Sequence, residues 1–385
     1  YWYNDCYGSK GSVSHSPDQV FVAPVFIDGE IIAFAQSWAH FADIGGMWPG
    51  SISPDCTDIF QEGIIIPPVR LAEKGVVNDD LLRIFFRNSR FPDMLRGDTR
   101  ACFAAVRLGE RRLGELAERF GVDVVIDAFQ QLSERSEQTA TERLRETFKP
   151  GSYRFADAVD HDGQGNGPYR LAMELNVDDN GVVLDFSDSD DQAPGPINYL
   201  VNPAVPRAML GMYLLAGDPT LFLNAGAGRA VDEVVLREGS VLQPKWPAPL
   251  GQRGLTMMRL LSSTMGLVNA AGGESQAANC AYVIYFARGV GEDGNTFLMS
   301  DGVGVGYGAR PYADGINAVY YVAQENYPAE MMEQTYPARL RAYGIHRDSG
   351  GPGRWRGGCG VVREIELLAP EATFAIRIDG VKKPA

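Results

Sequence analysis

The chain has 385 residues, of which 45% are hydrophobic and 22% are charged, and its formal net charge is −14 at pH 7. This composition is typical of a globular soluble protein, and the length is sufficient for a large core in one or two domains. The negative charge leaves no basic surface for phosphates, so neither nucleic acid nor an anionic membrane is expected as a partner. No apolar stretch reaches the ~18 to 20 residues that a membrane span requires.

Cysteine usage and the two chain ends give two further expectations. The five cysteines are scattered and include no C-x-x-C pair, which is the usage of reduced thiols in a cytoplasmic protein. The first residues, YWYNDCYG, read as the middle of a strand, and the chain ends as abruptly at KKPA. We therefore expect this sequence to be a fragment of a longer chain. The lack of a targeting segment in it is then weak evidence about where the protein is located.

A hairpin is the clearest element near the N-terminus. Residues 20–27 form a β-rich apolar run, Asp28-Gly29 is a turn dipeptide, and residues 30–38 form a second apolar run. Two such runs separated by Asp-Gly are typical of antiparallel strands joined by a tight turn.

Two His-x-x-Asp pairs flank this hairpin, His15 with Asp18 and His40 with Asp43. Counting outward from the turn places Asp18 opposite Ala39, so both pairs are expected at the open end of the hairpin. Two imidazoles and up to two carboxylates suit a divalent metal, and the residue types leave Zn, Mn and non-haem Fe(II) open.

A structural role for these residues is the alternative. A histidine at a strand end is often hydrogen-bonded only to backbone, and an aspartate before a strand is often a turn or cap residue. The motif occurs twice in a chain with only four histidines, so a metal site and a structural role are equally supported by the residues alone. The other two histidines, His161 and His346, lie in polar Gly/Asp-rich stretches and are expected in surface loops.

Three helices are expected after the hairpin. Asn78 caps a helix that runs to Asn88, a longer one covers 93–120, and a third runs from Asp123 to near Phe148, as capping residues and apolar periodicity indicate. Their charged faces are expected to be solvated, and we assign them no chemistry.

The chain from residue 151 onward is expected to be β-rich. Three strand-like segments separated by Asp-Gly and Asn-Gly turns predict a meander, and helices are expected at 205–215 and 255–268, the second one buried. Glycine at every second position of 302–311 predicts a strand with one bare face, against which another backbone or a ligand packs; we favour close backbone packing.

These elements predict an α+β fold with mixed and antiparallel sheets, long helices and large glycine-rich loops. Residues 1–150 are expected to form a region of hairpin and helices, and residues 151–385 a β-rich domain. The chain contains no G-x-x-x-x-G-K-[ST] motif, so no P-loop for a nucleotide is expected.

Several longer motifs carry a family resemblance. NDCYGSKGSVSHSPD, AHFADIGGMWPGSISPD, IFQEGIIIPP and DSGGPGRWRGGCGVVRE resemble the hydantoinase B/oxoprolinase family, which includes the metal-bearing subunits of acetone and acetophenone carboxylases. The matching motifs occur in order over nearly the whole chain. Family members are longer at both ends, which agrees with the fragment interpretation.

The resemblance implies a subunit of a cytoplasmic, heteromeric, ATP-dependent enzyme that uses no biotin and acts on a small carbonyl compound. ATP is bound by a hydantoinase A-like ATPase subunit, which phosphorylates the substrate, and small accessory subunits are further partners in some complexes. The family's metal ligands, Mn(II) in acetone carboxylase, fall on His15, Asp18 and His40. Asp43 matches the family's second aspartate and is expected to be a catalytic residue beside these ligands or a fourth ligand.

Two activities within this family remain open. Carboxylation of a ketone, with an enolate held at the metal, is slightly favoured by aromatic residues that suit an aromatic ketone: Trp38, Phe41, Trp48, Tyr307 and Tyr312. ATP-driven opening of a cyclic amide such as hydantoin, 5-oxoproline or a lactam is the alternative. A metal-free paralogue that only scaffolds a complex is the non-enzymatic alternative.

Overall fold

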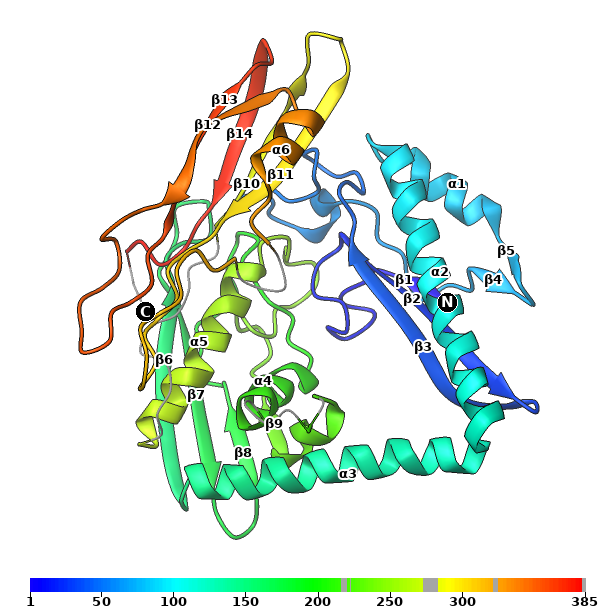
Figure 1. The fold of residues 1–385 in the computed structure, drawn as a ribbon, viewed down its shortest axis with the longest axis vertical. Helices are drawn as coiled ribbons and strands as arrows, with labels where there is room; N and C mark the ends of the chain where they lie inside the picture. The colour runs from blue at the N-terminus through cyan, green and yellow to red at the C-terminus, as the bar shows by residue number, and fades with distance from the viewer. Residues whose placement is uncertain (216–219, 222, 273–282, 321–324, 383–385) are drawn as a thin grey trace. The chain divides into compact units, whose positions relative to one another are not determined.

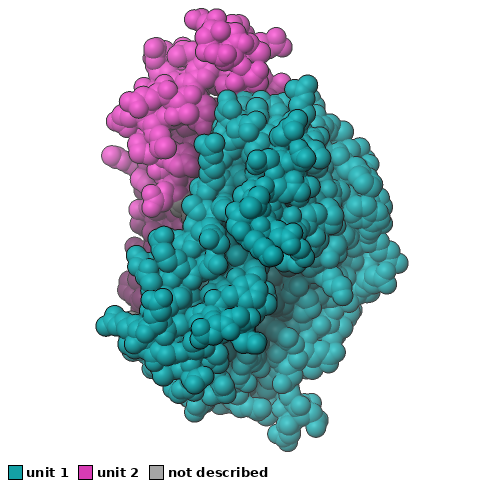
Figure 2. All heavy atoms as spheres, turned by 90° about the vertical axis from the view of Figure 1, so that its right-hand side faces the viewer, with its two compact units in different colours: residues 1–152, 162–164, 175–253 teal, residues 153–161, 165–174, 254–385 magenta. Residues whose placement is uncertain are grey.

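The computed structural model describes residues 1–215, 220–221, 223–272, 283–320 and 325–382 (Figure 1). Long helices and mostly antiparallel sheets make up an α+β fold, which confirms the expected fold class. The chain divides into two compact units, coloured separately in Figure 2. Unit 1 comprises residues 1–152, 162–164 and 175–253, and unit 2 comprises residues 153–161, 165–174 and 254–385.

The expected hairpin is present in unit 1. Strands β1 (Trp2–Tyr3), β2 (Asp18–Ile27) and β3 (Glu30–His40) form an antiparallel sheet in the order β1-β2-β3. The turn residues Asp28 and Gly29 have φ angles of 52° and 87°, as a type I′ turn requires, and the Asp-Gly dipeptide takes up this backbone readily.

The hairpin contains a β-bulge that the sequence did not predict. Val25 pairs with Ala33, whereas the next residue of β2 pairs with Ile31, so Ile32 is an extra residue in β3. A bulge of this kind leaves one residue unpaired and offsets every pair beyond it by one position. Nothing in the apolar run around Ile32 marks the place, because no glycine or polar residue interrupts it there.

The bulge decides which residues face each other at the open end of the hairpin. Asp18 lies opposite His40, and not opposite Ala39 as counting from the turn required, so the expected register is wrong by one residue. Opposed residues of antiparallel strands share a face, and successive residues alternate between faces. The counted register would therefore have placed Asp18 and His40 on opposite faces of the sheet.

Helix α2 (Pro92–Phe120) lies along one face of this hairpin (Figure 1). Small residues on the strands let the helix approach closely: a Cβ added at Gly109 of α2 would lie 3.2 Å from the Cβ of Ala35. The shared core is formed by buried side chains of the hairpin, of α2 and of neighbouring segments, among them Trp2, Phe21, Phe41, Ile44, Phe85, Leu95, Cys102 and Val106.

The other expected helices of unit 1 are also found. Helix α1 (Asp79–Arg87) is capped by Asn78, whose side chain accepts hydrogen bonds from two backbone N–H groups of the first turn. Helix α3 (Val122–Thr147) follows α2 after Gly121. The remaining elements of unit 1 are η1 (Ile59–Glu62), β4 (Ala72–Glu73), β5 (Val76–Val77), β8 (Val182–Asp185), α4 (Ala204–Leu215), η2 (Ala225–Ala230) and β9 (Glu233–Val235).

The β-rich part begins with β6 (Gly151–Val159) and β7 (Tyr169–Val177), within which the chain passes between the units. These strands continue the expected meander into β8, and β9 joins β8 in parallel, giving the order β6-β7-β8-β9. Unit 2 also contains α5 (Gly254–Ala270), largely buried as expected, and α6 (Ala329–Thr335). Its further strands are β10 (Val283–Val290), β11 (Thr296–Val303), β12 (Ala338–Ile345), β13 (Val361–Leu367) and β14 (Glu371–Arg377).

The glycine-rich stretch 302–311 is a regular strand only at its start, because β11 ends at Val303. Beyond it, Val305 makes an isolated bridge with Val319. A Cβ added at Gly304 would lie 2.7 Å from the carbonyl oxygen of Ala318. The bare glycine thus admits a neighbouring backbone, as close packing requires.

Four cysteines, Cys6, Cys56, Cys102 and Cys359, are free thiols, and Cys280 lies outside the described residues. None of the helices in the described ranges is both long enough and apolar enough to cross a membrane.

The bulge generates a first prediction. Deleting Ile32 removes the extra residue and leaves regular pairing in which Asp18 still faces His40, whereas deleting Ile32 together with Ala33 shifts the pairing by one position and turns His40 away from Asp18. We expect the double deletion to lose affinity for a divalent cation by about 100-fold or more relative to the single deletion, as measured by isothermal titration calorimetry. The single deletion keeps the pairing at the open end of the hairpin and is the matched control. Equal affinities of the two deletion variants would show that the register of the hairpin does not align the site.

Candidate metal centre

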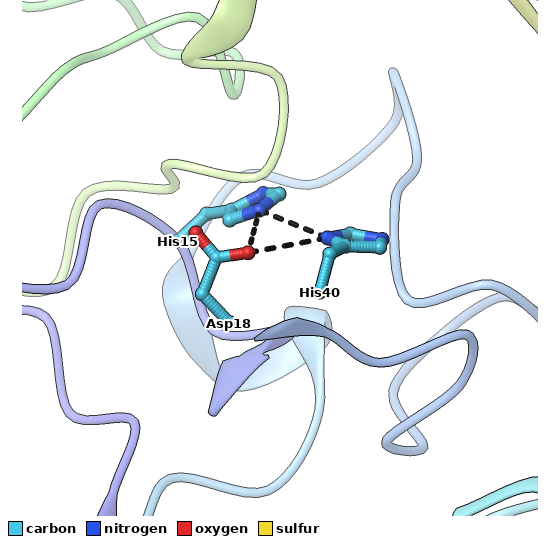
Figure 3. A group of neighbouring side chains, drawn as sticks. All are labelled: His15, Asp18 and His40. Carbon is cyan, nitrogen blue, oxygen red and sulfur yellow. Dashed lines mark hydrogen bonds and ion pairs between the residues drawn. The ribbon is translucent and has the colours of Figure 1, made fainter. Parts of the chain in front are cut away.

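Three side chains converge at the open end of the hairpin (Figure 3). Asp18 is the first residue of β2, His40 is the last residue of β3, and His15 lies in the loop that leads into β2. The Nε2 atom of His15 is 2.9 Å from Oδ1 of Asp18 and 3.1 Å from Nδ1 of His40, and this Nδ1 is 3.3 Å from the same Oδ1.

The spacing of these three atoms fits a shared divalent cation. Nitrogen and oxygen ligands about 2.1 Å from one metal ion lie roughly 3.0 to 3.4 Å from each other in octahedral or tetrahedral geometry. Across the residues that the structure describes, His15, Asp18 and His40 are the one group of His, Cys, Asp and Glu ligand atoms close enough to hold a metal. Sequence reasoning selected the same three residues as ligands.

His15 is held as a neutral imidazole. Its Nδ1–H donates to the carbonyl oxygen of Gly251 at 3.2 Å, which leaves the lone pair of Nε2 directed at Asp18 and His40. Burial lowers the pKa of His15 to about 4, and the nearby charge of Arg253 acts in the same direction. The imidazole is therefore uncharged at neutral pH, as metal binding requires.

Asp18 supplies the negative charge of the cluster. Burial alone would raise the pKa of its carboxyl, but His15, His40 and Arg253 around it hold this pKa well below its usual range. Arg253 donates from Nη2 to Oδ2 of Asp18 at 3.3 Å and from Nε to the hydroxyl of Ser14 at 2.6 Å. Oδ1 of Asp18 is thereby left to face the two imidazoles.

Asp43 is not part of this cluster. Its buried carboxylate accepts hydrogen bonds from Nη2 of Arg90 at 2.8 Å and from the backbone N–H groups of Gly50 and Arg90. The same guanidinium donates to the carbonyl oxygens of Gly45 and Trp48. Asp43 and Arg90 therefore order the glycine-rich loop that follows β3, and a catalytic role for Asp43 stays a prediction.

Sequence reasoning missed the loop 247–253, which brings Gly251 and Arg253 to the cluster. These residues are more than 200 positions from His15, and the segment PAPLGQRG carries no charge or spacing pattern that marks a site. Glu62 was missed as well. Its Oε1 accepts hydrogen bonds from the N–H groups of Leu250 and Gly251, both at 2.6 Å.

The aromatic residues expected near the site have different environments. Phe41 is fully buried in the core beneath α2, so it does not face a ligand. Trp38 has 63% of its surface exposed, two residues before His40 on β3. Tyr307 and Tyr312 belong to unit 2.

Together the fold and the cluster define an α+β protein with a candidate divalent-metal site on a β-hairpin. The chain belongs to the Hydantoinase B/oxoprolinase family, whose family model matches residues 1–385. This membership confirms the resemblance seen in the sequence motifs.

Three relatives illustrate the breadth of the family. The chain is 30% identical to a proposed D-/L-hydantoinase subunit of Pseudomonas sp. (strain NS671), over 96% of its own length and 64% of the relative. It is 27% identical to the acetophenone carboxylase delta subunit of Aromatoleum aromaticum, over 91% of its own length and 53% of that subunit. The crystal structure of the ATP-dependent caprolactamase from Pseudomonas jessenii matches with a TM-score of 0.85 and 27% identity. The match covers 95% of this chain and 64% of the caprolactamase chain. The chain thus spans about two thirds or less of these proteins.

Removal of one ligand tests the cluster. His40→Ala is expected to reduce the affinity for Mn(II), Zn(II) or Fe(II) by about 100-fold or more, because two of three ligand atoms remain. His346→Ala removes an exposed histidine of unit 2 and is the matched control. Elemental analysis and titration calorimetry measure the effect, and unchanged metal binding by His40→Ala would rule out the cluster as the site.

The ionisation of Glu62 predicts a pH dependence of stability. Burial raises its pKa from 4.5 to about 8, although the N–H groups of Gly251 and Leu250 act in the opposite direction. Between these two pH values the folded state binds a proton that the unfolded state does not, so the contribution of Glu62 to stability falls as pH rises through this window.

Glu62→Gln removes this titration. We expect urea unfolding to show that the variant gains roughly 3 to 5 kcal/mol relative to the wild type between pH 5 and pH 9. Other titrating groups are shared by the two proteins and cancel in the difference. Parallel stability curves over this range would contradict a raised pKa for Glu62.

Proposed function

We propose that this chain is the metal-binding subunit of an ATP-dependent complex that acts on a small carbonyl compound. The observation that carries the proposal is the convergence of His15, Asp18 and His40 with metal-ligand spacing. Membership of the Hydantoinase B/oxoprolinase family supports it. ATP is proposed to bind to a hydantoinase A-like ATPase subunit, which passes a phosphorylated compound to this chain.

The residues around the cluster have distinct tasks in this proposal. A divalent cation bound there would polarise a carbonyl or phosphoryl oxygen, or lower the pKa of a water molecule. His15 stays neutral because it is buried, and its hydrogen bond to Gly251 keeps Nε2 available. Arg253 balances the charge of Asp18, so a positively charged site remains for an oxyanion.

Opening of a cyclic amide is the first candidate reaction. It is supported by the similarity to a relative named as a hydantoinase subunit and to the caprolactamase from Pseudomonas jessenii. The aromatic environment that favoured a ketone in the sequence is weaker in the structure, because Phe41 belongs to the core. In this reaction the site would hold the oxygen that becomes negative when water adds to the activated ring carbonyl.

Carboxylation of a ketone is the second candidate, and the similarity to the acetophenone carboxylase delta subunit supports it. In this reaction the same positive site would hold an enolate oxygen while CO2 adds to the neighbouring carbon. A scaffold without catalysis remains the alternative to both, and it is disfavoured by the presence of all three ligand residues.

An activity assay separates these candidates. The chain is reconstituted with a hydantoinase A-like subunit and ATP. One set of reactions contains a cyclic amide, either hydantoin or caprolactam, and the other contains acetophenone together with 14C-bicarbonate. We expect ATP-dependent ring opening without fixed label, and loss of at least about 100-fold in turnover in Asp18→Asn. Acid-stable label with acetophenone would establish the carboxylase instead. If Asp18→Asn keeps full activity with either substrate, the proposed catalytic role of this site is wrong.

A further inference from the structure

We propose that Glu62 is a positioning residue of the candidate metal centre, which clamps the backbone of residues 250–251 and so fixes the tautomer of His15. The inference deepens the proposed function and rests on its metal site. Glu62 belongs to the segment IFQEGIIIPP. It touches no ligand residue directly, and its influence reaches His15 through the main chain.

The clamp is a chain of short contacts between buried groups. Oε1 of Glu62 accepts hydrogen bonds from two successive N–H groups, those of Leu250 and Gly251, at 2.6 Å each. The carbonyl oxygen of Gly251 in turn accepts the Nδ1–H of His15 at 3.2 Å. Glu62 and His15 have relative exposures of 0% and 3%, so water does not replace these hydrogen bonds easily.

Two features show that the contact between Glu62 and this backbone is closely fitted. A Cβ added at Gly251 would lie 3.2 Å from Oε1 of Glu62, so a side chain at this position would press on the carboxyl group. Glu62 ends the short helix η1, and the N–H of Ile59 in the same helix donates to the carbonyl oxygen of Pro247 at 2.9 Å. The first and the last residue of helix η1 are therefore both hydrogen-bonded to the loop 247–253.

Other contacts hold this loop but do not replace the clamp. Asn198 donates to the carbonyl oxygen of Pro249 at 3.1 Å, and the N–H of Gln252 donates to the carbonyl oxygen of Pro196 at 2.9 Å. These bonds fix the residues on either side of the peptide between Leu250 and Gly251. Among the described residues, Glu62 is the side chain that accepts hydrogen bonds from the backbone N–H groups of Leu250 and Gly251.

The clamp requires one acceptor oxygen on a side chain as long as that of glutamate. It does not require a negative charge. Oε1 receives both hydrogen bonds, whereas Oε2 is buried and has no hydrogen-bond partner among the described residues. Burial also raises the pKa of Glu62, which favours the uncharged acid at neutral pH. A glutamine presents an equivalent carbonyl oxygen at the same distance from the backbone, and an aspartate is one methylene too short.

Loss of the clamp would change the site through the proton on His15. If the Gly251 carbonyl moves away, Nδ1 loses its acceptor, and the proton is free to move to Nε2. A protonated Nε2 would donate to Asp18, which lies 2.9 Å away, and no lone pair would remain for a cation. Partners of metal-bound histidines that fix the tautomer in this way typically change metal affinity by about 10- to 100-fold.

Three variants of the full chain test the proposal. Glu62→Asp keeps the carboxyl group but shortens it, Glu62→Gln keeps the length and the acceptor, and Leu95→Ala destabilises the core beneath α2 without touching the loop. Two quantities are measured for each: Mn(II) and Zn(II) affinity by competition with a chelating dye, and the tautomer of His15 in the metal-free, 15N-histidine-labelled protein by long-range 1H–15N NMR. Thermal unfolding records how far each variant is destabilised.

We expect Glu62→Asp to weaken metal binding about 10- to 100-fold and to lose the Nδ1–H signature of His15. Glu62→Gln should retain both, and Leu95→Ala should retain both at an equal or larger loss of stability. Wild-type affinity and tautomer in Glu62→Asp, or an equal loss in Leu95→Ala, would overturn the clamp. If the wild type binds no metal, the proposed metal site fails, while the tautomer of the metal-free protein still decides the role of Glu62.

Discussion

The single extra residue in β3 is the constraint on which the candidate metal centre depends. Side chains alternate between the two faces of a strand, so the offset at Ile32 decides whether His40 and Asp18 share a face. With the bulge, a local sequence motif and a strand end 22 residues away meet within hydrogen-bond distance. Helix α2 packs closely against small residues on one face of the two strands.

A second, distant part of the chain completes the surroundings of the hairpin. The loop 247–253 supplies the carbonyl group that orients His15 and the guanidinium that balances Asp18. Neither group belongs to the cluster of candidate ligands, yet each affects the charge or the proton position of a residue that does. The site is thus assembled from a rigid β-scaffold and one irregular segment, which agrees with the frequent placement of functional groups on loops held by regular elements.

Local patterns allowed much of this to be predicted from the sequence. The cap at Asn78, the Asp28-Gly29 turn and the contact between His15 and Asp18 all act over a few residues, and each is found where it was expected. The register was missed because the bulge at Ile32 has no local signal in the sequence. Gly251 and Glu62 were missed for the same reason, since a backbone carbonyl and a buried acid acquire their roles only through contacts between distant segments.

Exposure is unequal within the cluster. The side chain of His40 is 40% exposed, whereas those of His15 and Asp18 are 4% and 8% exposed. Solvent therefore reaches the cluster most readily at His40. In the proposed complex, a carbonyl compound that covered His40 would slow the exchange of a bound ion with solution, so substrate would retain the ion as well as react beside it.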